Sequence, residues 1–92
     1  MNHSTYIHAE TRAPIPLIPM QPVESTKLAE VGYRPDTQTL AVTFRSGKPA
    51  VYHYPNFPSQ EYQALRTAES MGKHFGAHVQ RRAFDKYVPS GK

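Results

Sequence analysis

The chain has 92 residues, no cysteine and a formal net charge of +4. A chain of this length forms one domain at most and buries a modest share of its surface, so a deep, water-excluding catalytic cavity is hard to build. Without cysteine it has no disulfide, thiolate metal site or cysteine nucleophile. It starts with no signal-type segment and contains no long apolar run, so we expect a cytoplasmic, non-enzymatic binding domain that does not engage a membrane.

The net charge lies in the second half of the chain. Residues 1–45 hold four basic and four acidic residues, whereas residues 46–92 hold seven basic and three acidic ones. Such a bias favours an anionic partner, whether a nucleic acid, an acidic protein face or a lipid surface. Charge alone does not choose among these classes.

Residues 1–22 differ in kind from the rest of the chain. Prolines at positions 14, 16, 19 and 22 alternate with Ile15, Leu17, Ile18 and Met20. Each proline fixes φ and removes a donor, which predicts an extended, proline-rich N-terminal arm. Two interpretations are open: a disordered leader, or an apolar strap that docks on the domain or on a partner. The apolar residues favour docking, because a solvated linker is normally more polar.

Residues 28–54 have the pattern of a β-meander. A first strand is expected over 28–33, followed by a turn at Arg34-Pro35-Asp36. Large apolar side chains at 40, 42 and 44 alternate with Ala41, Thr43 and Arg45 at period two, which indicates a strand with one buried face. Ser46-Gly47-Lys48-Pro49 has turn chemistry, and 51–54 has the β-branched and aromatic composition of a strand. These segments predict a three-stranded antiparallel sheet.

Two helices are expected after the meander. Pro55 and Pro58 end the third strand, and Ser59 is placed to cap a helix that runs to about Glu69. Ser70 is placed to cap a second helix through Val79. The predicted fold is therefore α+β, with an arm at 1–22, a domain at 23–88 and a tail at 89–92 that frays. We expect the core to contain Val31, Leu40, Val42, Phe44, Tyr62, Leu65, Phe75 and Val79.

Several short motifs follow one another from Val23 to Tyr87. They are Val23-Glu24-Ser25-Thr26, Val31-Gly32-Tyr33, Leu40-Ala41-Val42-Thr43-Phe44-Arg45-Ser46-Gly47, Tyr52-His53-Tyr54 with Pro58, the helical set Tyr62, Leu65, Ala68 and Ser70, and Gly72-Lys73-His74-Phe75 before Val79 and Arg81. This order resembles the KTSC domain, which occurs alone and at the C-terminus of some bacterial lysyl-tRNA synthetases. The resemblance implies a short β-meander with helices and, through the synthetases, a role in RNA binding. It implies no catalytic residues. The proline-rich arm and Ala83-Phe84-Asp85-Lys86 depart from the pattern.

Tyr52 and Tyr54 are expected on one face of the third strand, with His53 on the other, because side chains alternate across a sheet. An open face would let a base stack on these tyrosines. A face covered by helices would make them core residues. The sequence leaves both interpretations open.

The densest basic stretch follows the first expected helix. It contains Arg66, Lys73, His74, Arg81, Arg82 and Lys86. On helices, several of these side chains would share a face and neutralise phosphates, so that binding would depend on salt and little on sequence. The alternative is an ordinary solvated surface.

His74 and His78 have the spacing of two zinc ligands on one helix, but the sequence offers no third ligand and we expect no metal site. It offers no nucleophile elbow either, and we expect no cofactor.

We therefore expect a non-catalytic module that binds RNA or a ribonucleoprotein complex through the six basic residues, with Tyr52 or Tyr54 stacking on bases. The second hypothesis is a phage-encoded protein inhibitor, acting in the host cytoplasm, that binds a CRISPR surveillance complex and blocks its nucleic-acid recognition. It rests on a general similarity in length and charge to small anti-CRISPR proteins. The oligomeric state does not follow from the sequence.

Overall fold

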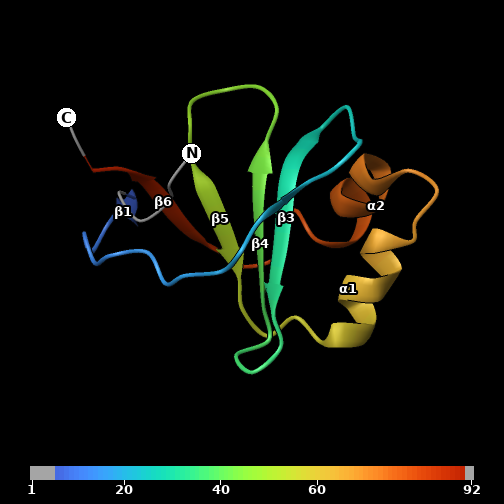
Figure 1. Ribbon diagram of the computed structural model, residues 1–92, viewed down its shortest axis with the longest axis horizontal. Coiled ribbons are helices and arrows are strands. Elements are labelled where there is room, and N and C mark those ends of the chain that lie inside the picture. The colour runs from blue at the N-terminus through green and yellow to red at the C-terminus, as the bar shows by residue number, and fades with distance from the viewer. Residues whose placement is uncertain (1–5, 91–92) are drawn as a thin grey trace.

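The computed structural model describes residues 6–90, which form one antiparallel sheet and two helices (Figure 1). The elements in chain order are β1 (Tyr6–His8), β2 (Gln21–Pro22), β3 (Leu28–Arg34), β4 (Thr39–Phe44), β5 (Val51–Tyr54), α1 (Ser59–Arg66), α2 (Met71–His78) and β6 (Asp85–Pro89). The spatial order of the strands is β1-β6-β5-β4-β3-β2. The expected α+β class is confirmed.

The centre of the sheet is formed by β3, β4 and β5, which correspond to the strands expected near 28–33, 40–45 and 51–54. Val31 pairs with Val42, and Leu40 pairs with Tyr54, so alternate residues of neighbouring strands share a face. Gly47, at a φ of 95°, supplies the left-handed residue between β4 and β5.

The expectation of only three strands is wrong, because the described residues form six. β6 extends the meander beside β5, β1 pairs with β6 at one edge, and β2 pairs with β3 at the other. These added strands have two to five residues and no apolar alternation that would reveal them. They form because the outer strands of the meander offer unpaired backbone groups. Of the tail expected to fray, Pro89 lies in β6, and residues 91–92 lie outside the described part.

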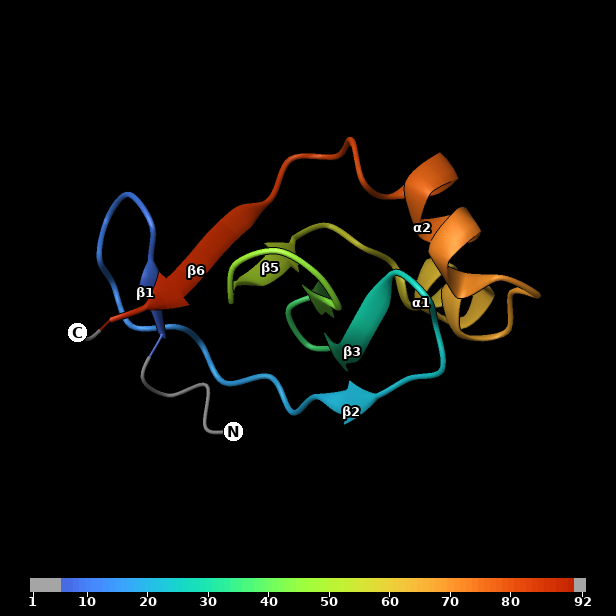
Figure 2. The ribbon, with the colours of Figure 1, turned by 90° about the horizontal axis from the view of Figure 1, so that it is seen from above.

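The proline-rich segment runs from one edge of the sheet to the other, as Figure 2 shows for the blue stretch between β1 and β2. Ile18 is 6 % exposed and packs with Ala41 and Val51. Gly32 makes the close approach possible, since a Cβ there would lie 2.2 Å from the carbonyl oxygen of Pro19. Residues 15–20 therefore form a strap on the sheet; residues 1–5 lie outside the described part.

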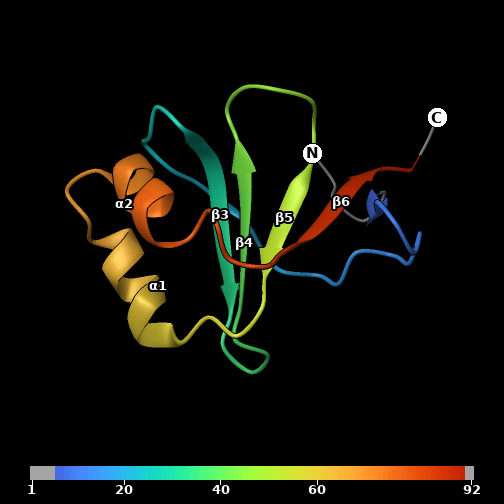
Figure 3. The same cartoon turned by 180° about the vertical axis from the view of Figure 1, so that it is seen from behind.

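The sheet carries a core on each face. The face with the helices buries ten residues, namely Val23, Leu28, Val31, Leu40, Val42, Tyr54, Phe57, Leu65, Phe75 and Val79. The face under the strap buries Tyr6, Ile18, Ala41, Val51 and Tyr87. Six of the eight expected core residues are fully buried, while Phe44 and Tyr62 are partly buried. Figure 3 shows the helices beside β3, so that the end of the sheet at β5 and β6 is less covered.

The helix ends differ from the sequence expectation at α1. Pro58 takes the N-cap position without a side-chain hydrogen bond, so the predicted capping by Ser59 is wrong. α1 also ends at Arg66, before the expected Glu69. At α2 the prediction is confirmed, since Ser70 Oγ accepts a hydrogen bond from the Lys73 amide at 3.3 Å. Neither helix is long and apolar enough to cross a membrane, within the residues described.

Candidate nucleic-acid interface

The basic residues predicted to act together lie in three places. Arg66 is on α1, where its guanidinium donates to Tyr62 Oη at 2.9 Å and to Gln21 Oε1 at 3.4 Å. It therefore faces β2 at the edge of the sheet. Lys86 is on β6, beyond the other side of the meander. The remaining four, Lys73, His74, Arg81 and Arg82, are on α2 and the segment that follows it.

Arg82 holds the two helices together. Its guanidinium forms an ion pair with Glu61 of α1, donates to the carbonyl oxygen of His78 at 3.0 Å and lies 5.0 Å from the centre of the Phe57 ring. A charge engaged in this way is less available to a phosphate. Its neighbour Arg81 is exposed and pairs with no carboxylate in residues 6–90.

His74 and His78 lie on the same side of α2, with ring centres 4.6 Å apart. In the described part of the chain, no three histidine, aspartate or glutamate side chains are arranged to hold a metal ion. Lys73 is exposed near the start of the helix.

Tyr52 and Tyr54 do share the face of the sheet that carries the helices, but their environments differ. Tyr54 is 1 % exposed and contacts Phe75 of α2 and Phe84, with ring centres 5.6 Å away in both cases. Burial raises the pKa of Tyr54 to about 12, and the neighbouring Tyr52 adds to the rise. A base cannot reach the Tyr54 ring without displacing these neighbours, so Tyr54 is a core residue.

Tyr52 is half-buried and belongs to a group of rings that reaches the surface. Its ring makes T-shaped contacts with the rings of Phe44 and Phe84, each with its centre 5.2 Å away. The ammonium of Lys86, its register partner on β6, lies 5.8 Å from the centre of the Tyr52 ring. Phe84 is 47 % exposed. We call Phe44, Tyr52, Phe84 and Lys86 the aromatic–cation site.

Sequence reasoning missed Phe84 and Lys27. Phe84 was noted only as part of a segment that departs from the family pattern, and its position between a helix and a strand gave no periodicity to follow. Lys27 lies just before β3, far in sequence from the basic stretch. Its Nζ is 5.8 Å from the centre of the Phe75 ring and donates to Gln80 Oε1 at 2.6 Å. Only the fold brings it to α2.

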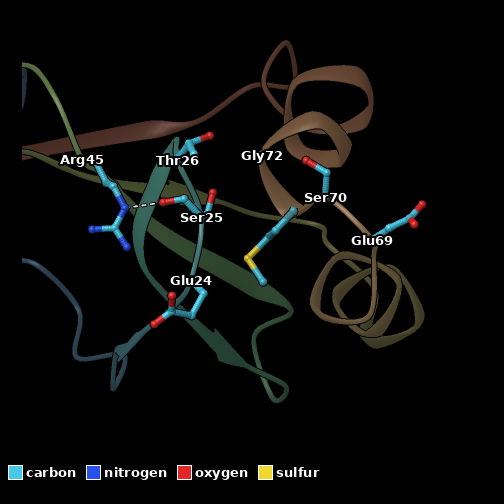
Figure 4. A pocket seen from close by; sticks show the side chains of 8 residues that line it. Glu24, Ser25, Thr26, Arg45, Glu69, Ser70 and Gly72 are labelled. Atoms are coloured by element: carbon cyan, nitrogen blue, oxygen red, sulfur yellow. Dashed lines mark hydrogen bonds between the residues drawn. The ribbon is translucent and has the colours of Figure 1, made fainter.

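A polar hollow of about 540 Å³ lies between the loop before β3 and the start of α2 (Figure 4). It is lined by Glu24, Ser25, Thr26, Arg45, Glu69, Ser70, Met71 and Gly72. The Arg45 guanidinium donates to the carbonyl oxygens of Val23, at 2.7 Å, and Ser25. Ser25 Oγ accepts from the amides of Lys27 and Leu28 at 3.1 Å each, which fixes the loop.

Together these features define a small α+β domain with an aromatic and basic surface beside one polar hollow. The KTSC domain family model matches residues 24–84, about two thirds of the chain. The chain belongs to the KTSC domain family. The match includes the hollow and Phe84 but ends before Lys86 and leaves out the strap.

Two proteins of similar sequence and one solved structure resemble the chain. An uncharacterized protein of Stutzerimonas stutzeri is 43 % identical over 53 residues, which is 58 % of this chain and 72 % of that one. A protein of Tsukamurella paurometabola is 40 % identical over 63 residues, covering 68 % of this chain and 91 % of the relative. The crystal structure of a KTSC domain protein from Yersinia pestis superposes with a TM-score of 0.67 at 28 % identity, covering 74 % of this chain and 94 % of the other.

Proposed function

We propose that the protein is a non-catalytic module that binds RNA, free or within a ribonucleoprotein complex, through the aromatic–cation site. The observation that carries this proposal is the Tyr52 ring, which lies beside the exposed Phe84 ring and beneath the Lys86 ammonium. An aromatic ring next to a cation suits a nucleotide, because the base stacks on the ring while the phosphate meets the charge.

The expected strength of such a site is modest and dependent on salt. Stacking of one base on an aromatic side chain contributes roughly 1–3 kcal/mol, and each neutralised phosphate releases bound counterions. Arg81 and Lys86 suit this role, since neither pairs with a carboxylate within residues 6–90. Arg66, Lys73 and His74 would extend the positive surface over the helices.

The test is a titration of labelled single-stranded RNA with the whole protein at several salt concentrations. We expect weak binding without marked sequence preference, and a negative slope of log affinity against log salt. Lys86→Ala should reduce the magnitude of that slope by about 0.7, the contribution of one phosphate of a single strand. Lys48→Ala is the matched control, because Lys48 carries the same charge in the exposed turn between β4 and β5. An equal loss in both variants would show that only net charge matters and would refute the proposed site.

A pull-down from bacterial lysate, with and without ribonuclease, compares this proposal with the inhibitor hypothesis. Heterogeneous RNA that is lost with all co-purifying protein after ribonuclease supports direct RNA binding. A defined set of CRISPR proteins retained after ribonuclease would instead support the phage-encoded inhibitor. That second outcome would indicate that the domain contacts a protein and not RNA.

A further inference from the structure

The aromatic–cation site and the polar hollow are connected through Lys27. At one end, the Lys27 ammonium lies over Phe75, whose ring centre is 5.5 Å from that of Phe44. At the other end, a Cβ on Gly72 would lie 3.1 Å from Lys27 Cβ and 3.4 Å from Ser25 Oγ. Lys27 therefore borders both the rings and the hollow.

Three cationic side chains lie along the path from the aromatic–cation site to the polar hollow, and each keeps hydrogen-bond donors for a ligand. Lys86 stands over Tyr52, and Lys27 uses one donor on Gln80. Arg45 uses Nε and one Nη on backbone carbonyls, which leaves part of its five-donor guanidinium for other acceptors. The surface between the aromatic rings and the hollow thus carries positive charge next to rings on which a base can stack.

The hollow itself does not suit a phosphate. Glu24 and Glu69 line it and would repel one, whereas their carboxylates accept hydrogen bonds from hydroxyl and amino groups. Thr26 and Ser70 add hydroxyls that donate and accept. Its volume of about 540 Å³ is within the range of about 300–1,000 Å³ that small-molecule sites have. The sugar and base of one nucleotide fit this chemistry, and a ribose 2′-hydroxyl adds one donor and acceptor that DNA lacks.

We propose that this path binds one unpaired RNA strand, with a base on Tyr52 and Phe84, the backbone across Lys27 and Arg45, and the sugar and base of a further nucleotide in the hollow. The inference rests on the proposed RNA binding and specifies its substrate class. A base in a duplex is covered on both faces by its neighbours, so the aromatic rings have a partner only in an unpaired strand. Arg66 and Arg82, which could widen the contact toward a duplex, are engaged with Gln21 and Glu61.

The experiment compares two ligands on the full chain: a single-stranded RNA of about eight nucleotides, and a hairpin in which the same sequence is fully paired. We expect the single strand to bind about 5- to 150-fold more tightly, which corresponds to stacking of one base. The single-stranded DNA of the same sequence should bind more weakly than the RNA. Equal affinity for strand and hairpin would overturn the inference and leave RNA binding intact, whereas no binding to either would refute both.

Substitutions test the path itself. Lys27→Gln removes the positive charge but keeps a polar side chain, one bond shorter, and should weaken single-strand binding at least about threefold, with little change for Lys48→Gln. Thr26→Glu places a negative charge at the rim of the hollow and should also weaken binding. Gln60→Glu, at an exposed position on α1, is its matched control. Thermal unfolding confirms that each variant folds, and unchanged affinity in folded Lys27→Gln and Thr26→Glu would overturn the path.

Discussion

His8 Nε2 lies 3.0 Å from Asp85 Oδ1 and joins the first strand of the sheet to the last. The other ring nitrogen, Nδ1, accepts hydrogen bonds from the amides of Glu10, at 3.0 Å, and Thr11, at 3.1 Å. Because Nδ1 accepts twice, the proton of the neutral ring is on Nε2, which donates to Asp85. The Tyr87 ring makes a T-shaped contact with the same imidazole, with ring centres 5.2 Å apart. One side chain thus fixes the turn after β1 and the pairing of β1 with β6.

We expect His8→Ala to be more destabilising than Asp85→Ala. The first removes two amide hydrogen bonds and a ring contact, which should lower the free energy of unfolding by about 1–2 kcal/mol. The second removes only a half-exposed partner and should lower it by less than about 1 kcal/mol. Urea denaturation followed by circular dichroism measures both. The reverse order would show that the ion pair, and not the turn, holds β1.

Gly32→Ala should displace the strap. The new methyl group would lie 2.2 Å from the Pro19 carbonyl oxygen, so either the strap or β3 must move. Overpacking of this kind costs roughly 1–3 kcal/mol. Gly76→Ala is the control, because its Cβ would meet only the ends of flexible side chains, at 3.4 Å or more, and alanine favours the helix. Faster proteolysis within residues 15–20 should accompany Gly32→Ala alone. Equal resistance in the two variants would contradict the account of the strap.

The central strands and helices were predictable because their signals are local. Large apolar side chains recur at every second residue of 40–45, and Ser70 has the chemistry of a cap, so β4 and α2 could be identified without knowing their neighbours. The expected single buried face was wrong, because Ala41 is buried on the other face under the strap. β1, β2 and β6 could not, since their pairing is decided by the free edges of the meander. A two-residue strand such as Gln21–Pro22 carries no pattern of its own.

The candidate site was predictable only in part, for the same reason. Tyr52 and Lys86 were identified by residue type, and their contact depends on the pairing of β5 with β6. Arg82 was expected to act like Arg81, because sequence does not reveal that Glu61 of α1 reaches it. Tyr54 is buried and Tyr52 is half-buried, although both face the same side of one strand, and sequence does not reveal this difference.

Arg81 and Arg82 provide a matched pair for separating RNA binding from stability. Arg82→Ala removes an ion pair, a carbonyl contact and a ring contact, and should lower the free energy of unfolding by about 1 kcal/mol, since the ion pair is partly exposed. Arg81→Ala should change it by less than about 0.5 kcal/mol. RNA affinity should respond in the opposite way, with the larger loss in Arg81→Ala. Chemical denaturation and RNA titration of both variants measure this, and a larger affinity loss in folded Arg82→Ala would contradict the assignment.

We expect the protein to lose stability in alkali, because the buried Tyr54 hydroxyl resists ionisation. Its pKa is about 12 in the folded chain, compared with about 10 for an unfolded tyrosine, because the phenolate is costly to bury. Between these values the unfolded chain has released the proton that the folded chain still holds. The free energy of unfolding therefore falls as pH rises from 10 to 12, by up to about 2–3 kcal/mol, and this contribution is fully retained below pH 10.

Tyr54→Phe tests this linkage without emptying the core, because it removes only the ionising hydroxyl. Burial also raises the pKa values of Tyr33 and Tyr87, so some alkaline loss should remain in the variant. We expect a shallower decline of stability above pH 10 than in the wild type, measured by urea denaturation at successive pH values. Absorbance of the phenolate should show one late-titrating tyrosine fewer. If the variant and the wild type lost stability equally with pH and showed the same number of late-titrating tyrosines, Tyr54 would be open to water. The reason for assigning base stacking to Tyr52 and not to Tyr54 would then be lost.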